Sequence, residues 1–164
     1  MSAPGSLTFF CGKMGAGKST LAARLAAEEG AVLLSEDDWL ATLYPDQIKS
    51  FDDYIACARR LRPLMRDLVR QLLAAGTDVV MDFPANTARQ RKWFLDLANE
   101  AGAPHKLIYL EASDALCLSR IAQRRTAQPA RAAFDTPEVF HHVTQFFEEP
   151  GEGEGAIKHV IRSH

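Results

Sequence analysis

The chain has 164 residues, of which 47% are hydrophobic and 24% are charged. This is an ordinary globular composition, and the length predicts one domain (residues 1–164) with an apolar core. The net charge of −2 gives no basic footprint for general binding to nucleic acid, and no apolar run is long enough to cross a membrane.

The three cysteines, Cys11, Cys57 and Cys117, are far apart and form no C-x-x-C motif. An odd number of widely spaced cysteines is typical of reduced thiols. The first residues also lack the basic and apolar segments of a secretion signal. We therefore expect a cytoplasmic protein.

The first predicted element is an apolar strand at Leu7–Cys11, and glycines follow it at once. Residues 12–19, here called the phosphate loop, match the pattern G-x-x-x-x-G-K-S. Glycines let the backbone take positive φ and approach a ligand closely, and the N–H groups of such a loop attract phosphate. The residues predicted to contact a nucleotide are Gly12, Lys13, Met14, Gly15, Ala16, Gly17, Lys18, Ser19 and Thr20.

Two side chains of this pattern have specific roles. Lys18 is expected to reach the β- and γ-phosphates, and the Ser19 hydroxyl is expected to bind Mg²⁺. An ordinary Gly-rich turn is the structural alternative, but the pattern lies between a strand and a helix, as a phosphate-binding loop requires. The loop therefore predicts a nucleoside triphosphate and Mg²⁺ as cofactors.

Further along the chain, helical and strand patterns alternate. A helix at 18–29 is followed by a short strand at 31–35, and a helical or irregular piece continues to Tyr44. The longest helical pattern runs over 53–75. Because Pro63 lies inside it, we expect a kink or a break there.

Four arginines of that helix, Arg59, Arg62, Arg66 and Arg70, fall on one face at helical spacing. A solvated charged face is the favoured interpretation, and an anion-binding role is the alternative.

The second half of the chain continues the alternation, which predicts an α/β fold with a parallel sheet of about five strands. The predicted elements are a strand at 77–81, a loop at 83–85, a helix at 88–101, a strand at 106–110, a helix at 113–125, a mobile loop at 126–136, a helix at 136–148, a loop at 150–155 and a strand at 156–162.

Acidic residues follow two of the predicted strands. In open α/β sheets, ligands bind beyond the carboxyl ends of the strands, so Asp37, Asp38 and Asp82 are expected near the phosphate loop. Asp82 suits the Mg²⁺ side, and a carboxylate of the Asp37-Asp38 pair could take the proton of an attacking hydroxyl. Simple helix or strand caps are the alternative for all three. Trp39 is a candidate to flank a substrate or to pack.

Arginines end the helix before the mobile loop. Arg120 and Arg124 are four residues apart and so share a helix face. Over the phosphates, a guanidinium would neutralise the charge that develops in phosphoryl transfer. Favourable cations at a helix C-terminus are the alternative.

Together these motifs resemble the small P-loop kinases, in the group of the polynucleotide kinase domain, the zeta toxins and chloramphenicol phosphotransferase. The resemblance covers nearly the whole chain. It rests on Gly12–Thr20, on Asp37-Asp38, on Asp82 with Asn86, and on Arg120-x-x-x-Arg124.

The resemblance implies a P-loop NTPase fold like that of nucleoside monophosphate kinases. This is a three-layer α/β/α structure with strand order 2-3-1-4-5 and a lid, here at about 126–136. It also implies ATP as the donor, Asp37 as the general base, Arg124 over the phosphates and Arg120 near the nucleotide. Residues 147–157, here called the base-side segment, resemble the loop that lies near the adenine.

One departure concerns the acceptor. The polynucleotide kinase pattern has an arginine three residues after its first Asp, where this chain has Leu40. Glu36 adds a third acid beside the pair, which suits a neutral or cationic acceptor. We therefore expect Asp37, Asp38, Trp39 and Asn86 to contact a small molecule rather than a nucleic acid.

The leading hypothesis is an ATP- and Mg²⁺-dependent kinase that phosphorylates a hydroxyl of a small molecule. One alternative is a nucleotide-binding regulatory ATPase without an acceptor. Another is a 5′-hydroxyl nucleic-acid kinase, which the arginine face would favour.

Overall fold

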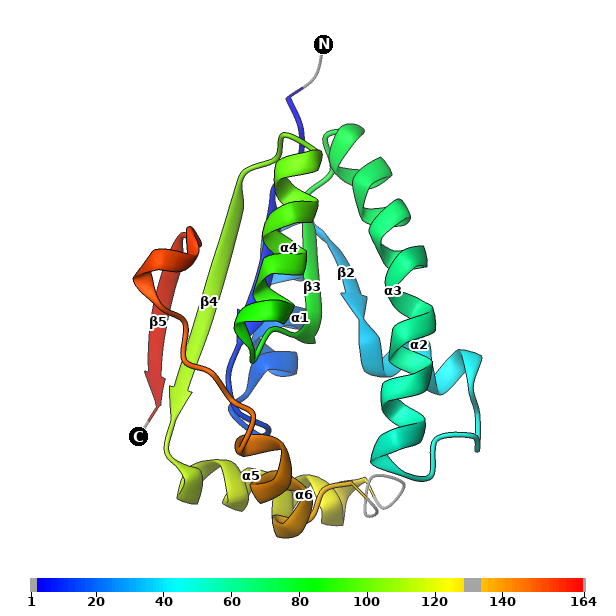
Figure 1. Cartoon of the computed structure of the whole chain (residues 1–164), viewed down its shortest axis with the longest axis vertical. Helices are drawn as coiled ribbons and strands as arrows, with labels where there is room; N and C mark the ends of the chain where they lie inside the picture. Colours follow the sequence, from blue (N-terminus) through cyan, green and yellow to red (C-terminus); the bar gives the residue numbers. More distant parts are fainter. Residues whose placement is uncertain (1–2, 129–133, 164) are drawn as a thin grey trace.

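The computed structural model describes residues 3–128 and 134–163. Five parallel strands form one sheet in the order β2-β3-β1-β4-β5 (Figure 1), which confirms the predicted fold and strand order. The strands are β1 (Leu7–Cys11), β2 (Val32–Ser35), β3 (Val79–Pro84), β4 (His105–Ala112) and β5 (Lys158–Ser163).

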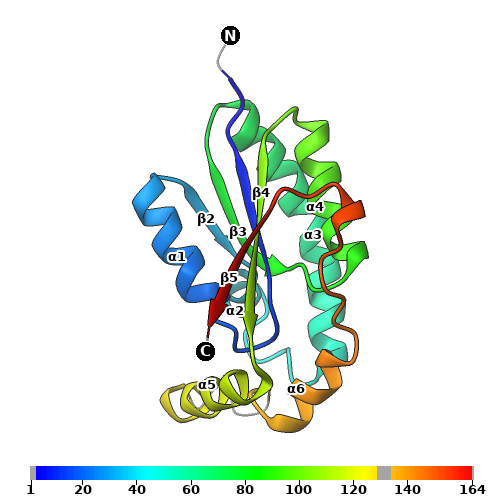
Figure 2. The same cartoon turned by 90° about the vertical axis from the view of Figure 1, so that its left-hand side faces the viewer.

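Helices cover both faces of the sheet (Figure 2), as a buried parallel sheet requires. The helix α1 (Lys18–Glu29) lies on one face, and α3 (Phe51–Ala74) and α4 (Ala88–Glu100) lie on the other. α2 (Glu36–Leu43) joins β2 to the region of α3, whereas α5 (Asp114–Ala127) and α6 (Pro137–Thr144) lie across the end toward which β4 and β5 point (Figure 1).

The central strand β1 is buried at every residue. Its side chains alternate between two cores, because successive residues of a strand point to opposite faces. Phe9 stacks on Phe94 of α4 with ring centroids 4.7 Å apart, whereas Phe10 belongs to the core beneath α1. The sheet thus holds the phosphate loop on a strand that both helix layers fix in place.

Helix α3 runs without interruption from Phe51 to Ala74, so of the two outcomes predicted at Pro63, a kink or a break, the break does not occur. Pro63 has no N–H and cannot donate to the carbonyl one turn earlier. A stripe of buried side chains nevertheless holds the helix against the sheet on both sides of the proline: Ala58, Leu61, Met65, Val69 and Leu73. Tertiary packing here outweighs the local helix-breaking tendency.

Strand β3 is longer than predicted and continues through Phe83 and Pro84, where the sequence indicated a loop. Asp82 therefore lies within the strand, opposite Ser35 of β2. The proline closes the strand, where its missing N–H costs little. Other elements also differ from the prediction: α6 ends at Thr144, a short 3-10 helix η2 (Glu152–Glu154) lies in the predicted 150–155 loop, and β5 begins at Lys158.

All three cysteines are free; Cys11 and Cys117 are buried and Cys57 on α3 is half-buried. In the part of the chain that the structure describes, no helix is long and apolar enough to span a membrane.

Candidate functional site

The phosphate loop joins the end of β1 to the first turn of α1, at the carboxyl edge of the sheet. Gly15 and Gly17 have φ of 82° and 102°, a left-handed backbone conformation that residues other than glycine rarely adopt. A Cβ atom on Gly15 would lie only 2.6 Å from the carbonyl oxygen of Cys117. The glycine is therefore needed because α5 packs directly on the loop.

Lys18 folds back over this loop. Its Nζ donates a hydrogen bond to the carbonyl oxygen of Gly12, the first residue of the loop. Burial lowers the pKa of Lys18, and the negative charges of Asp82 and Asp37 act in the opposite direction. The ammonium group is thus within electrostatic range of two of the three acids that the sequence predicted for the site.

Asp82 and Ser19, the two residues predicted to bind Mg²⁺, lie next to each other. Burial raises the pKa of Asp82, whereas a hydrogen bond with the Ser19 side chain and the charge of Lys18 lower it. A serine hydroxyl beside a carboxylate offers the hard oxygen ligands that Mg²⁺ prefers. No group of three or more His, Cys, Asp or Glu residues in the described ranges could hold a metal; a metal at Ser19 and Asp82 would therefore complete its shell with phosphate oxygens and water.

The acid pair lies in the first turn of α2, not in an extended segment. Ser35 caps this helix, and its hydroxyl accepts a hydrogen bond from the Asp38 N–H at 3.3 Å. Both Asp37 and Asp38 are exposed, and Trp39 is half-buried against the main core. Asp37 acts on the pKa of both Lys18 and Asp82, and its effect on Asp82 exceeds that of Asp38. Of the two acids, Asp37 is thus the better coupled to the phosphate loop.

Glu36 differs from the prediction, because it is only 2% exposed and faces α3 rather than an acceptor. The Tyr54 hydroxyl donates to Glu36 Oε1, and Arg62 NH2 lies 3.8 Å from Oε2. Burial raises the pKa of the Glu36 carboxyl to about 7, although Tyr54 and Arg62 lower it. Leu40, one turn later, is also buried, so an arginine there would point into the interior.

The predicted arginine face of α3 is divided between different partners. Arg62 turns inward, and its guanidinium lies 5.1 Å from the ring centroid of Trp93. Arg66 NH2 donates to both carboxylate oxygens of Glu100 on α4, at 2.6 Å each. Arg59 and Arg70 are exposed. The face is therefore not a continuous basic surface.

The two arginines of α5 have separate surroundings. Arg120 NH1 donates to the carbonyl oxygen of Ala16 at 2.8 Å, which places this guanidinium on the phosphate loop. Arg124 instead pairs with Asp135, with Nε to Oδ2 at 2.9 Å and NH2 to Oδ1 at 2.7 Å. Asp135 is 1% exposed. Arg124 is thus held by the residue that precedes the cap of α6.

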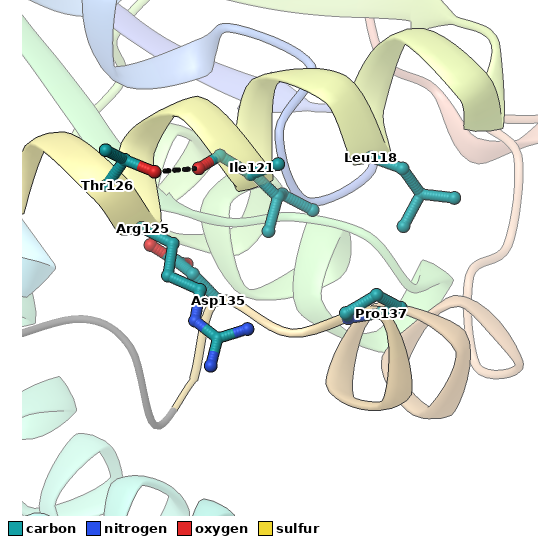
Figure 3. A pocket seen from close by; sticks show the side chains of 7 residues that line it. Leu118, Ile121, Arg125, Thr126, Asp135 and Pro137 are labelled. Atoms are coloured by element: carbon teal, nitrogen blue, oxygen red, sulfur yellow. Dashed lines mark hydrogen bonds between the residues drawn. The ribbon is translucent and has the colours of Figure 1, made fainter. Parts of the chain in front are cut away.

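A cavity of about 520 Å³ lies between α5 and α6 beside this pair (Figure 3). It is lined by Leu118, Ile121, Ala122, Arg125, Thr126, Asp135 and Pro137. The predicted lid at 126–136 borders the cavity, and its residues 129–133 lie outside the described part of the chain.

Asn86, predicted to contact the acceptor, is bonded to the phosphate loop. Its Oδ1 accepts a hydrogen bond from the Gly12 N–H at 3.0 Å. Arg91, which the sequence did not single out, is wholly buried and pairs with Glu154 at 2.6 Å. A lone arginine on an amphipathic helix carries no local signal that it will be buried, because its partner is 63 residues away.

The base-side segment also contacts the phosphate loop, through Phe147. Phe147 lies beside Tyr109 with ring centroids 6.2 Å apart, and Lys13 Nζ lies 5.9 Å from the Phe147 ring. Lys13 also pairs with Asp114 at 2.8 Å. An aromatic surface next to the phosphate loop suits a purine base.

Solved structures of kinases share this fold. A candidate kinase from Chloroflexus aurantiacus is 21% identical, with a TM-score of 0.77 over 99% of this chain and 86% of that one. The APS kinase from Mycobacterium tuberculosis, in complex with AMPPNP and APS, is 21% identical, with a TM-score of 0.63 over 96% and 89%. A gluconokinase from Sinorhizobium meliloti 1021 is 17% identical, with a TM-score of 0.59 over 99% and 84%.

No curated protein matches the chain by sequence. A family model described as AAA domain, however, matches residues 7–150, which include the phosphate loop, the acid pair, Asp82 and both α5 arginines. The chain therefore belongs to the AAA domain family.

Proposed function

We propose that this protein is a kinase that uses ATP and Mg²⁺ to phosphorylate a hydroxyl group of a small molecule. The observation that carries the proposal is the convergence of Lys18, Asp82 and Asp37 at the carboxyl edge of the sheet, where each affects the ionisation of another. A phosphate cradle, a metal side and an exposed acid on the first turn of α2 are the parts that phosphoryl transfer requires.

Each group has a distinct task in this proposal. Lys18 leaves the Gly12 carbonyl to bind the β- and γ-phosphates, and Arg120 and Arg124 offset charge on the transferred group. Ser19 and Asp82 would hold Mg²⁺, which neutralises phosphate charge when bound. Asp37 accepts the proton of the acceptor hydroxyl. At the same time the hydroxyl oxygen attacks the γ-phosphorus, and the bond between the γ-phosphorus and the leaving ADP breaks.

The fold of the APS kinase and gluconokinase structures supports a small-molecule acceptor, since each of those proteins is named for one. Within the kinases we place the chain with the polynucleotide kinase, zeta toxin and chloramphenicol phosphotransferase group on its motifs. The division of the arginine face between Glu36, Glu100 and solvent gives no support to a nucleic-acid acceptor. A cytoplasmic location, where ATP and Mg²⁺ are abundant, belongs to the same proposal.

The test is a screen for acceptor-stimulated ADP release with Mg²⁺-ATP, a set of hydroxyl-bearing metabolites and antibiotics, and a 5′-hydroxyl oligonucleotide. We expect at least one small molecule to stimulate release, and Asp37→Asn to abolish the stimulation. If only the oligonucleotide stimulated ADP release, the acceptor would be the 5′-hydroxyl of a nucleic acid and not a small molecule. ATP turnover that depends on a protein partner, and on no small molecule, would favour the regulatory ATPase.

A further inference from the structure

The turn between β3 and α4 contacts two parts of the proposed nucleotide site, the phosphate loop and the base-side segment. Asn86 Oδ1 accepts from the Gly12 N–H at 3.0 Å, and the Asn86 carbonyl oxygen accepts from the Glu148 N–H at 2.8 Å. The Asn86 N–H itself donates to the Gln90 side chain at 2.8 Å. One residue therefore bonds the first residue of the phosphate loop and the base-side segment at the same time.

Arg91 makes a second connection to the same parts. It is fully buried, and its NH1 donates to the Ala85 carbonyl oxygen at 3.0 Å and contacts Cys11 Sγ at 3.6 Å. Its Nε and NH2 bind the two carboxylate oxygens of Glu154 at 2.6 and 3.1 Å. Such a bidentate pair is rigid in orientation, so the 148–154 stretch is attached at two points, to Asn86 of the β3–α4 turn and to Arg91 of α4.

We propose that Asn86 and Arg91 are positioning residues for the nucleotide. They fix the phosphate loop and the base-side segment relative to each other, and they bind the protein rather than the phosphates or the base. This inference rests on the proposed function, because it concerns the ATP site of that kinase. It also assigns Asn86 to the donor side and not to the acceptor.

The hydrogen bonds of Gly12 explain why the loop needs such support. The Gly12 carbonyl accepts from Lys18 in this state, while the Gly12 N–H is turned toward Asn86. When Lys18 moves to the phosphates, the Gly12 carbonyl loses that bond, and Asn86 still holds the Gly12 N–H of the preceding peptide unit. A loop that is already ordered binds its ligand more tightly, because less ordering entropy is lost on binding.

The same turn also joins the two halves of the site. Asn86 lies two residues after the end of β3, and β3 carries Asp82 on the metal side. A single rigid strand and turn therefore set the distance between the metal side and the phosphate loop. Geometry that must hold within fractions of an ångström is best built on such an element.

The experiment compares Asn86→Ala with Asn99→Ala, which removes an exposed asparagine from the neighbouring helix α4. Leaving the Gly12 N–H without its partner should raise the dissociation constant for Mg²⁺-ATP about tenfold. We expect kcat at saturating ATP and the KM for the acceptor to change less than about twofold, since the chemistry and the acceptor contacts remain. Asn99→Ala should match the wild type in all three values.

Amide hydrogen exchange of the free protein gives a second measurement. Asn86→Ala should speed exchange in peptides covering the phosphate loop, and Glu154→Gln should speed it in the base-side segment. Asn86→Asp keeps an acceptor oxygen for Gly12 and should retain the slow exchange of the loop. This variant keeps the test decisive if Asn86→Ala folds poorly.

The two proposals fail in different ways. Equal ATP affinity and equal loop exchange in wild type and Asn86→Ala would overturn the positioning role and leave the kinase proposal intact. A rise in the acceptor KM alone would return Asn86 to the acceptor side. Absence of Mg²⁺-ATP binding by the wild type would overturn the proposed function, and the inference with it.

Discussion

At the scale of single residues, the two adjacent acids of α2 make separable predictions. Asp37 influences Lys18 and has the stronger effect on Asp82, whereas Asp38 also donates its N–H to the Ser35 cap. We expect Asp37→Asn to lower acceptor-dependent kcat by about 10² to 10⁴, the usual contribution of a positioned base. Asp38→Asn, the matched control, should lower it less than tenfold. The reverse order, measured as kcat in the same assay, would make Asp38 the base.

Glu36 predicts a pH dependence of stability. Burial raises its pKa from 4.5 to about 7 in the folded protein, so between these values the folded state binds a proton that the unfolded state has released. The unfolding free energy should therefore fall as the pH rises from 4.5 to 7. Glu36→Gln cannot ionise at this position, so its unfolding free energy should not show the fall that Glu36 causes. Glu152→Gln, at an exposed position, should show the same fall as the wild type. Urea titrations across this pH range measure both; parallel profiles for wild type and Glu36→Gln would contradict the prediction.

At the scale of elements, α3 contains a proline that should lower the stability of the protein. Pro63 is exposed and lies inside a continuous helix, where it removes one hydrogen bond. Pro63→Ala should stabilise the protein by about 1 to 3 kcal/mol, since alanine restores the bond and the helix propensity. Arg60→Ala at a neighbouring exposed position should change stability by less than about 0.5 kcal/mol. The check is the midpoint of urea unfolding; a destabilised Pro63→Ala would mean that the helix needs a distortion at this point.

The same scale shows what the sequence could and could not predict. Alternating apolar and helical periodicity was sufficient for the α/β class and a parallel sheet of about five strands, because β1 is hydrophobic on both faces. The strand order came from the resemblance to the small P-loop kinases. Periodicity could not find the extension of β3 through Pro84, which depends on pairing with β1 across an irregularity. It also could not place Arg62 and Arg91, because their partners come from distant elements. The acid pair was found from its place after β2, but its helical geometry depends on the Ser35 cap.

At the scale of the whole molecule, the proposal predicts coupling between ligand binding and global stability. A ligand that binds only the folded state stabilises it by about 2.7 kcal/mol at one hundred times its dissociation constant. Mg²⁺-ATP should therefore raise the melting temperature of the wild type, and Lys18→Ala should lose most of this rise. Melting curves without nucleotide serve as the control for any loss of fold. An equal rise in both proteins would mean that the nucleotide binds away from the phosphate loop.

The burial of two of the three cysteines has a practical consequence for such measurements. Burial raises the pKa of Cys11 to about 11 and also raises that of Cys117, so both thiols resist alkylation in the folded state. Cys57, half-buried on α3, is then the site at which a maleimide dye attaches in the native protein. Because α3 packs against the helix that carries Asp37, a dye there would report acceptor binding by fluorescence without any engineered cysteine.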